Sequence, residues 1–295
     1  MTTKTTETKN STPQTIDVPA SSQRENQPPT PETSHREQER DEFANGEYID
    51  PLAKLPRIQA LRGQSKETCG YFISVKEMAK AAWKDFEAIN DQLITYEFES
   101  SGDSELGLLL KNPRMLVCPR TPLLAFDRKK SNKEKQLVIL GGWEKDYKKD
   151  ENIANCQFYQ VILLSPDNEQ LHDVPFSYVA KGANHATFSQ HWQELVQQVT
   201  ACHAIANKIA ALPKNLKFNA LCVFSFSVAR EQAGTENKSY CCKVASHEVP
   251  NMENWKQFFV GYSQEIKELA WENLQPERPL LMPETLALPA SVEDK

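Results

Sequence analysis

Residues 137–212 read LVILGGWEKDYKKDENIANCQFYQVILLSPDNEQLHDVPFSYVAKGANHATFSQHWQELVQQVTACHAIANKIAAL, and this stretch decides the fold. Short apolar runs that are bounded by polar or turn residues are typical of buried strands. Three such runs predict strands at 137–142, 157–164 and 174–180. A loop rich in lysine and aromatic residues joins the first two.

The rest of this stretch predicts one long helix. After Gly182 the apolar residues recur every three or four positions, from Phe188 to Ile209, and glutamines occupy the opposite face. This spacing gives a helix one buried stripe. Because proline cannot continue the backbone hydrogen bonding, we expect the helix to cover about 185–211 and to end before Pro213.

Further strands are predicted on both sides of this stretch. On the N-terminal side the runs TCGYFIS, LITYEF, LGLLL, RMLVC and PLLAF are too short for typical helices and are separated by Gly, Asn, Pro or charged residues. On the C-terminal side two β-type runs flank a loop that contains glycine, which predicts a hairpin over 217–247. We expect the segment LPRIQALRG to lie against the core, either extended or as a short helix.

Two more helices are predicted outside the central stretch. Ser74 and Glu77 have the spacing of a capping box, and apolar residues continue at helical spacing to Ile89. Near the C-terminus Asn251 is a plausible N-cap for a helix whose apolar face continues to Leu274.

Together these elements predict an α+β fold. We expect a mostly antiparallel β-barrel or curved sheet, a long helix between strands and a C-terminal helix. Three strands, a helix and two strands is also the order of a five-stranded OB-type barrel, which often binds oligonucleotides. Many other α+β folds share this order, so the fold by itself does not establish a function.

Composition divides the chain of 295 residues into one domain and two tails. Residues 1–50 carry five basic and ten acidic side chains and few aromatic residues. Such a segment buries too little apolar surface to offset the entropy of ordering. We therefore expect a disordered acidic tail at 1–50, a single α+β domain at 51–275 and a flexible proline-rich tail at 276–295.

Cysteine usage and hydropathy bear on localisation. Seven cysteines without CxxC spacing fit neither a disulfide framework nor a zinc site, which favours a reducing compartment. The N-terminal residues lack the apolar core of a secretory signal, and no apolar run approaches the roughly 20 residues of a transmembrane helix. We expect a cytoplasmic protein without a membrane partner.

No pattern in the sequence predicts an active site. The phosphate-binding motifs GxxxxGK(S/T) and GxGxxG and the nucleophile turn GxSxG are absent. Asp103 and Glu105 fall in a predicted turn, where acidic residues serve the backbone. Nothing local supports His172 and Asp173 as an acid–base pair. We expect no catalytic residues and no cofactor, and the sequence favours a non-enzymatic protein.

A metal site is considered because four potential ligands, His185, His191, Cys202 and His203, lie close together in sequence. Zinc ligands on one helix share a face when they are about four residues apart. Neither the two earlier histidines nor the Cys202–His203 pair has this spacing. The sequence therefore predicts no metal site.

The formal net charge of −6 conceals a basic stretch. Residues 111–149 hold eleven lysine or arginine residues against four acidic ones, interleaved with three aromatic residues. Single-strand nucleic-acid sites combine cations for the backbone with aromatic faces for the bases. The predicted nucleic-acid-binding residues are Arg120, Arg128, Lys129, Lys130, Lys133, Lys135, Trp143, Lys145, Tyr147 and Lys148.

Four segments, LPRIQALRG, CGYFISVKEMAKAAW, ILLSPDN and YVAKGANHATFSQHW, resemble a family of uncharacterised cyanobacterial proteins that is known as a domain of unknown function. The resemblance covers most of residues 50–275 and implies a bacterial cytoplasmic protein. It implies no activity and no catalytic residues that could be transferred to this chain.

These observations leave three functions open, of which an enzyme of unrecognised type is the least favoured. The first is non-enzymatic, sequence-nonspecific binding of single-stranded DNA or RNA through the basic stretch. The second is a structural or partner-binding role without nucleic acid, in which the lysines form a solvated loop that only keeps the protein soluble. The sequence does not predict an oligomeric state.

Overall fold

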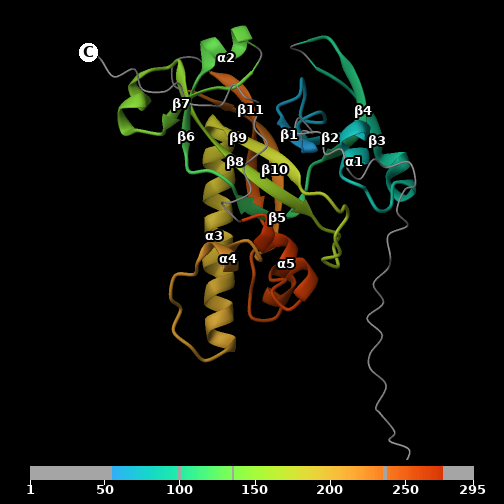
Figure 1. Cartoon of the computed structure of the whole chain (residues 1–295), viewed down its shortest axis with the longest axis vertical. Helices are drawn as coiled ribbons and strands as arrows, with labels where there is room; N and C mark the ends of the chain where they lie inside the picture. Colours follow the sequence, from blue (N-terminus) through green and yellow to red (C-terminus); the bar gives the residue numbers. More distant parts are fainter. Residues whose placement is uncertain (1–54, 99–100, 135, 235–237, 275–295) are drawn as a thin grey trace, which may run out of the picture. The chain divides into compact units, whose positions relative to one another are not determined.

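The computed structural model describes residues 55–98, 101–134, 136–234 and 238–274, which all belong to one compact unit (Figure 1). The predicted tails at 1–50 and 276–295 lie outside the described residues, as does Lys135.

Eleven strands form one mixed sheet. They are β1 (Arg57–Leu61), β2 (Gly70–Ser74), β3 (Leu93–Glu97), β4 (Ser104–Leu110), β5 (Arg114–Pro119), β6 (Leu124–Asp127), β7 (Val138–Gly142), β8 (Ile153–Leu163), β9 (Phe176–Lys181), β10 (Phe224–Ala233) and β11 (Ser239–His247). The main strand order is β11-β10-β5-β8-β9-β1-β2-β4-β3, and β6 and β7 branch off beside β8. Every pairing of the described strands is antiparallel except that of β1 with β9.

The predicted α+β class with a curved, mostly antiparallel sheet is confirmed. The OB-type barrel is not confirmed, because the sheet has eleven strands and is open, with β11 and β3 at its two ends. The five-strand order counted only elements after residue 137, whereas β1 to β6 come from the preceding part of the chain and join the same sheet.

Strand β8 connects the branches of the sheet. It is eleven residues long, and one of its edges pairs first with β6, at 153–156, and then with β5, at 159–163. Its other edge pairs with β9. From Phe158 onward every residue of β8 is buried, which is the part that the apolar run predicted. Residues 153–156 were not predicted as part of the strand, because half-buried residues there alternate with small buried ones and form no apolar run.

The main core lies where the long helix α3 (Gly182–Ala206) packs against β8, β9 and β11 (Figure 1). Its largest fully buried side chains include Tyr71, Tyr178, Phe188 and Phe224. Burial of one such side chain stabilises the fold by roughly 1.5–3 kcal/mol. The apolar stripe that predicted α3 is therefore the face that the sheet covers.

Helix α3 ends at Ala206, five residues before the predicted end at 211. The amide of Ile209 donates to the carbonyl of Ala204, and the amide of Lys208 donates to the carbonyl of Ile205. With Lys208 at φ 54°, these bonds form a Schellman motif. Since glycine or asparagine normally takes the left-handed position, a lysine there gave no sequence signal for the helix end.

The predicted C-terminal helix is wrong as one continuous element. The structure has a 3-10 helix, η3 (Trp255–Phe258), and a separate helix α5 (Gln264–Glu272). Between them Phe259 is extended and forms an isolated bridge with Cys222, and Val260 donates to the carbonyl of Leu221. This long-range pairing replaces the helical hydrogen bonds that the local spacing predicted.

The predicted helix from Ser74 to Ile89 is also shorter in the structure. Helix α1 covers Val75–Lys80, and Ala82, at φ 51°, lies just beyond its end. The capping box is not formed, because Ser74 makes no side-chain cap bond. The carboxylate of Glu77 instead accepts hydrogen bonds from the Arg57 amide, at 2.6 Å, and from Lys80, at 2.7 Å.

The remaining described helices are short: η1 (Glu87–Gln92), α2 (Arg128–Glu134), η2 (Lys145–Lys149) and α4 (Leu216–Asn219). LPRIQALRG, for which two forms were expected, supplies strand β1. All seven cysteines are free, and only Cys241 among them is not buried. Of the helices that the structure describes, none has the length and apolarity needed to cross a membrane.

Candidate functional site

Residues 124–134 and 136–149 form a substructure that we name the basic lobe. Strands β6 and β7 pair with each other, helix α2 joins them, and η2 follows β7 (Figure 1). Beneath them lies a small second core of four buried side chains, Phe126, Ala154, Cys156 and Phe158. The lobe is therefore fixed to β8 by backbone pairing and by its own apolar cluster.

Helix α2 begins directly after Asp127, which acts on its first turn. The Asp127 carboxylate accepts the Lys130 amide at 2.8 Å, and the Ser131 hydroxyl donates to the Asp127 carbonyl. The Ser131 hydroxyl oxygen also accepts the Val138 amide at 3.0 Å, which links the helix to β7. Asp is a favoured N-cap residue, so this local signal for a helix was present in the sequence but was not used.

Six of the ten predicted nucleic-acid-binding residues have exposed cationic side chains on the basic lobe. They are Arg128, Lys129, Lys130 and Lys133 on α2, and Lys145 and Lys148 on η2. Among the described carboxylates, only that of Asp127 approaches one of these six, lying 4.0 Å from Lys130. These side chains are thus available to an anionic ligand, whereas Lys135 lies outside the described residues.

Arg120 does not belong to this surface. It is half-buried, its guanidinium donates to the Asn273 carbonyl just after α5, and its amide donates to the Phe158 carbonyl at 2.9 Å. Two other cations of the basic stretch are similarly engaged: Arg114 contacts Asn168, Gln257 and Glu248, and Lys111 donates to a backbone carbonyl. The positive charge available to a ligand is therefore smaller than the sequence count suggests.

The aromatic residues of the basic stretch divide into two groups. Trp143 and Tyr147 are half-buried, and their ring centroids lie 5.9 Å apart at an interplanar angle of 54°. Phe126 is only 8% exposed and belongs to the small core, so it cannot stack on a base. Two of the three aromatic rings therefore retain an accessible edge or face beside the lysines.

His172 has a structural role that argues against the acid–base pair considered from sequence. Its Nε2 accepts the Leu163 amide at 2.8 Å, and its Nδ1 lies 3.0 Å from the Val174 carbonyl, to which it donates. Burial lowers the pKa of His172 to about 4. The neighbouring Asp173 pairs with Lys84 at 3.2 Å. Both ring nitrogens therefore stabilise the fold.

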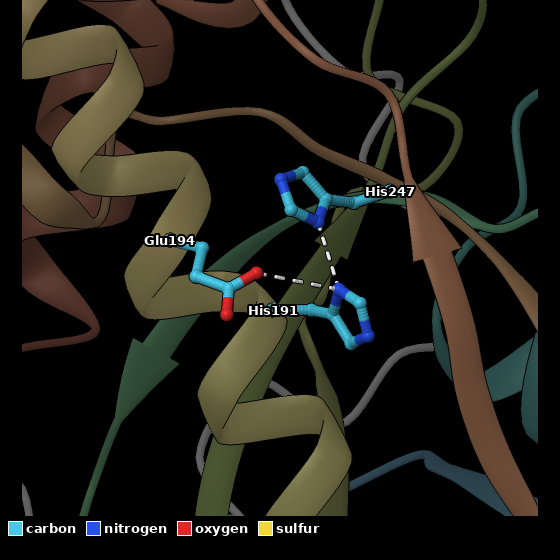
Figure 2. A group of neighbouring side chains, drawn as sticks. All are labelled: His191, Glu194 and His247. Atoms are coloured by element: carbon cyan, nitrogen blue, oxygen red, sulfur yellow. Dashed lines mark hydrogen bonds and ion pairs between the residues drawn. The ribbon is translucent and has the colours of Figure 1, made fainter.

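A further group of side chains lies between α3 and β11, at His191, Glu194 and His247 (Figure 2). The Nδ1 atoms of the two histidines are 2.8 Å apart, and Glu194 Oε2 lies 3.8 Å from His191 Nδ1. Burial, and next the facing His191 ring, lowers the pKa of His247. We name these three residues the His–Glu cluster.

Sequence reasoning missed the His–Glu cluster because it compared His191 only with neighbours on the same stretch. His247 is 56 residues further along the chain and reaches the cluster only because β11 packs against α3. His185 instead contacts Gln157, and the His203 ring packs edge-on against Trp255. The local signal that was available is the three-residue spacing of His191 and Glu194.

The comparison with protein families gives one match, to a domain of unknown function (DUF5895), over residues 53–293. The chain therefore belongs to this family, which confirms the resemblance seen in the sequence. The cyanobacterial origin stays a prediction. No curated protein and no solved structure matches the chain.

Proposed function

We propose that this protein binds single-stranded nucleic acid through the basic lobe. The observation that carries the proposal is that the basic lobe exposes Arg128, Lys129 and Lys133 on α2 and holds the half-buried ring pair of Trp143 and Tyr147 at η2, where Lys145 and Lys148 are also exposed. Lysine and arginine side chains neutralise backbone phosphates, and aromatic faces stack on unpaired bases.

The same arrangement favours binding without sequence specificity. Contacts to phosphate fix the position of a strand but carry no sequence information. Stacking is also tolerant, because every base has a π-face. The OB-type fold of the sequence prediction is not needed for this function, since the proposed surface consists of one hairpin, one helix and one helical turn.

The test is fluorescence anisotropy of a labelled oligonucleotide, measured over a range of salt concentrations. Each phosphate contact on a single strand contributes about −0.7 to the slope of log affinity against log salt. The double variant Lys129→Ala/Lys133→Ala removes two contacts, so we expect the slope to become shallower by about 1.4. The matched control is Lys76→Ala/Lys256→Ala, which removes two exposed lysines outside the lobe and should leave the slope unchanged.

Absence of binding at low salt would refute the proposal. An equal loss of affinity in the control variant would show that only net charge matters and would refute the assignment to the basic lobe. A duplex competitor of the same length tests the preference for single strands, because paired bases cannot stack on Trp143 or Tyr147.

A second candidate function, binding of a protein partner, is favoured by a different observation. Ile205, Ile209, Leu212 and Leu216, at and after the end of α3, are each at least 50% exposed. Exposed apolar patches on soluble proteins mark interaction sites. This function becomes the better one if no oligonucleotide binds, and exchanging Ile209 and Leu212 for glutamine would then abolish the association.

A further inference from the structure

We propose that the His–Glu cluster, His191, Glu194 and His247, binds one divalent transition-metal ion, and that Zn²⁺ is the ion that suits it. This inference goes beyond nucleic-acid binding and uses none of the residues of the basic lobe. The carrying observation is that one potential ligand atom from each of the three side chains lies within 4.8 Å of the others (Figure 2).

The two elements that hold the ligands are fixed in the fold. His191 and Glu194 are three residues apart on α3 and therefore share a face. His247 is the last residue of β11, and it pairs with Phe226 of β10 in the sheet register. The amide of Val244, three residues earlier on β11, donates to the Thr187 hydroxyl of α3 at 3.1 Å. The ligands thus converge from a helix and a strand that are tied together independently of any metal.

The hydrogen bonds of His247 leave its Nδ1 lone pair directed into the cluster. Its Nε2 lies 3.1 Å from Gln198 Oε1, and because an amide oxygen only accepts, Nε2 carries the proton. In the neutral ring Nδ1 is then unprotonated, and it faces His191 Nδ1 at 2.8 Å. Two imidazole nitrogens that face each other share either one proton or one metal ion.

Two glutamines, Gln190 and Gln198, hydrogen-bond to the ligand side chains and fix their orientation, as outer residues do around metal sites. Gln190 donates to Glu194 Oε1 at 3.0 Å, which leaves Oε2 as the oxygen nearest to His191. Gln198 holds the outer nitrogen of His247 in the same way. In metal proteins such outer partners fix the tautomer and the direction of the ligand, and their loss typically weakens binding 10- to 100-fold.

The donor set selects the class of ion. Two imidazoles and one carboxylate suit Zn²⁺ and related transition metals, whereas Mg²⁺ and Ca²⁺ require mainly oxygen ligands. Bonds of about 2.0–2.2 Å in a tetrahedron put neighbouring ligand atoms about 3.3–3.6 Å apart. Two of the observed separations, 2.8 Å and 3.8 Å, lie on either side of this range, and the third is at most 4.8 Å, so side-chain rotations are needed to bring all three atoms onto one ion.

The cluster is open to solvent on one side. The side chain of His191 is 21% exposed and that of Glu194 is 43% exposed. Three protein ligands and an accessible fourth position are the arrangement of catalytic zinc sites, where water occupies that position. The ion would also join α3 to the end of β11 and so stabilise the hairpin of β10 and β11.

The experiment uses untagged protein that has been stripped of metal and kept reduced. Zinc is titrated against a chromophoric chelator, and the amount bound after dialysis is measured by elemental analysis. We expect one equivalent of Zn²⁺ for the unchanged protein, and at least about 100-fold weaker binding for Glu194→Gln and for His191→Gln, since each removes a ligand rather than an outer partner. Mg²⁺ and Ca²⁺ should not compete.

Each variant has a matched control in the same chain. Glu268 on α5 accepts from Gln264 at i−4, the same arrangement as Glu194 with Gln190, so Glu268→Gln should bind zinc normally. His203→Gln on α3 is the control for His191→Gln. Cys241→Ser should also keep the site, which excludes binding through the one cysteine that is not buried. Glu194→Gln keeps the acceptor for Gln190, so circular dichroism should show an unchanged fold.

A variant of the orienting residue Gln198 distinguishes a metal site from a cluster that is held together only by hydrogen bonds. Gln198→Ala should weaken zinc binding about 10-fold or more without removing any ligand. Zinc should raise the melting temperature of the unchanged protein but not that of Glu194→Gln, because a ligand that binds only the folded state stabilises it. The proposal is overturned if the unchanged protein binds no zinc, or if Glu194→Gln and His191→Gln bind it as tightly as their controls.

Discussion

The hydroxyl groups of Tyr71 and Tyr178 lie 2.8 Å apart in the core, across strand β1, which separates their two strands. Tyr178 donates to Asn184 Oδ1 in the first turn of α3, and Asn184 Nδ2 donates to the Cys242 carbonyl of β11 at 2.9 Å. Because Tyr178 gives its proton to Asn184, Tyr71 must donate to Tyr178. Burial raises the pKa of both tyrosines above the ordinary value, so both hydroxyl groups keep their protons. The hydrogen bonds from Tyr71 to Tyr178 and from Tyr178 to Asn184 therefore run in one direction.

This direction predicts unequal effects of removing the two hydroxyl groups. Tyr178→Phe removes both the acceptor of the buried Tyr71 hydroxyl and the hydroxyl that donates to the buried Asn184 Oδ1, so we expect a loss of about 2–3 kcal/mol in the free energy of unfolding. Tyr71→Phe removes only one donor, and we expect a loss of about 1 kcal/mol. Urea denaturation of both variants measures the difference, and equal losses would contradict the assigned direction.

The buried His172 predicts a pH dependence of stability. Its pKa in the folded state is about 4, below the ordinary value of 6.5, because burial disfavours the charged ring. As the pH falls below about 6.5 the unfolded chain takes up a proton that the folded protein refuses, so the free energy of unfolding declines until about pH 4. The total is on the order of 3 kcal/mol.

The matched variant for this prediction is His172→Gln, which cannot titrate. It should be less stable at neutral pH, because it disturbs the bonds to Leu163 and Val174. The difference in stability from the unchanged protein should shrink between pH 6.5 and 4. A constant difference over that range would show that His172 is protonated equally in both states.

Two glycines in strands predict opposite outcomes for the same substitution. A Cβ atom at Gly107 of β4 would overlap the Ile73 carbonyl oxygen and lie 2.6 Å from Phe72 Cζ. Overpacking of this kind costs about 1–3 kcal/mol, so Gly107→Ala should lower the melting temperature markedly. At Gly142 of β7 no atom lies within 4 Å of the added Cβ, and Gly142→Ala should change stability by less than about 0.5 kcal/mol. Similar melting temperatures for the two variants would refute the placement of β4.

The substitution Trp143→Ala distinguishes a role of this ring in oligonucleotide binding from a role in stability. If a base stacks on its accessible side, Trp143→Ala should weaken oligonucleotide binding by about 1–3 kcal/mol. Tyr240→Ala is the control, because Tyr240 is an accessible aromatic ring, with Arg230 3.5 Å from its centroid, that lies outside the basic lobe. A large fall in melting temperature with unchanged affinity would instead assign Trp143 to the packing of the lobe.

The strands could be predicted because the boundaries of a short strand are a local property of the sequence. Runs such as RMLVC and LITYEF carry their own boundaries in the neighbouring Gly, Pro and charged residues, and they form β5 and β3. Helix ends were harder, because distant contacts decide them. Phe259 leaves the helical conformation to bridge Cys222, and no pattern around Phe259 indicates this partner.

The candidate sites divide in the same way, into residues that the local sequence indicates and residues that only the fold brings together. The lysines of α2 were identified because charge density is visible in the sequence itself. The contact of Arg120 with Asn273 could not be foreseen, because Asn273 is 153 residues away. The His–Glu cluster was missed for the same reason, since only the fold brings His247 beside His191.

One edge of β8 pairs with both β5 and β6, and this arrangement limits how the architecture could have changed during evolution. Substitutions among the exposed lysines of α2 change the surface charge without removing buried contacts. Deletion of residues 124–149 is different, because it would leave the backbone groups of β8 at 153–156 without their β6 partner. Unpaired strand edges template aggregation. A shortened descendant of this protein would therefore need another segment to cover that edge.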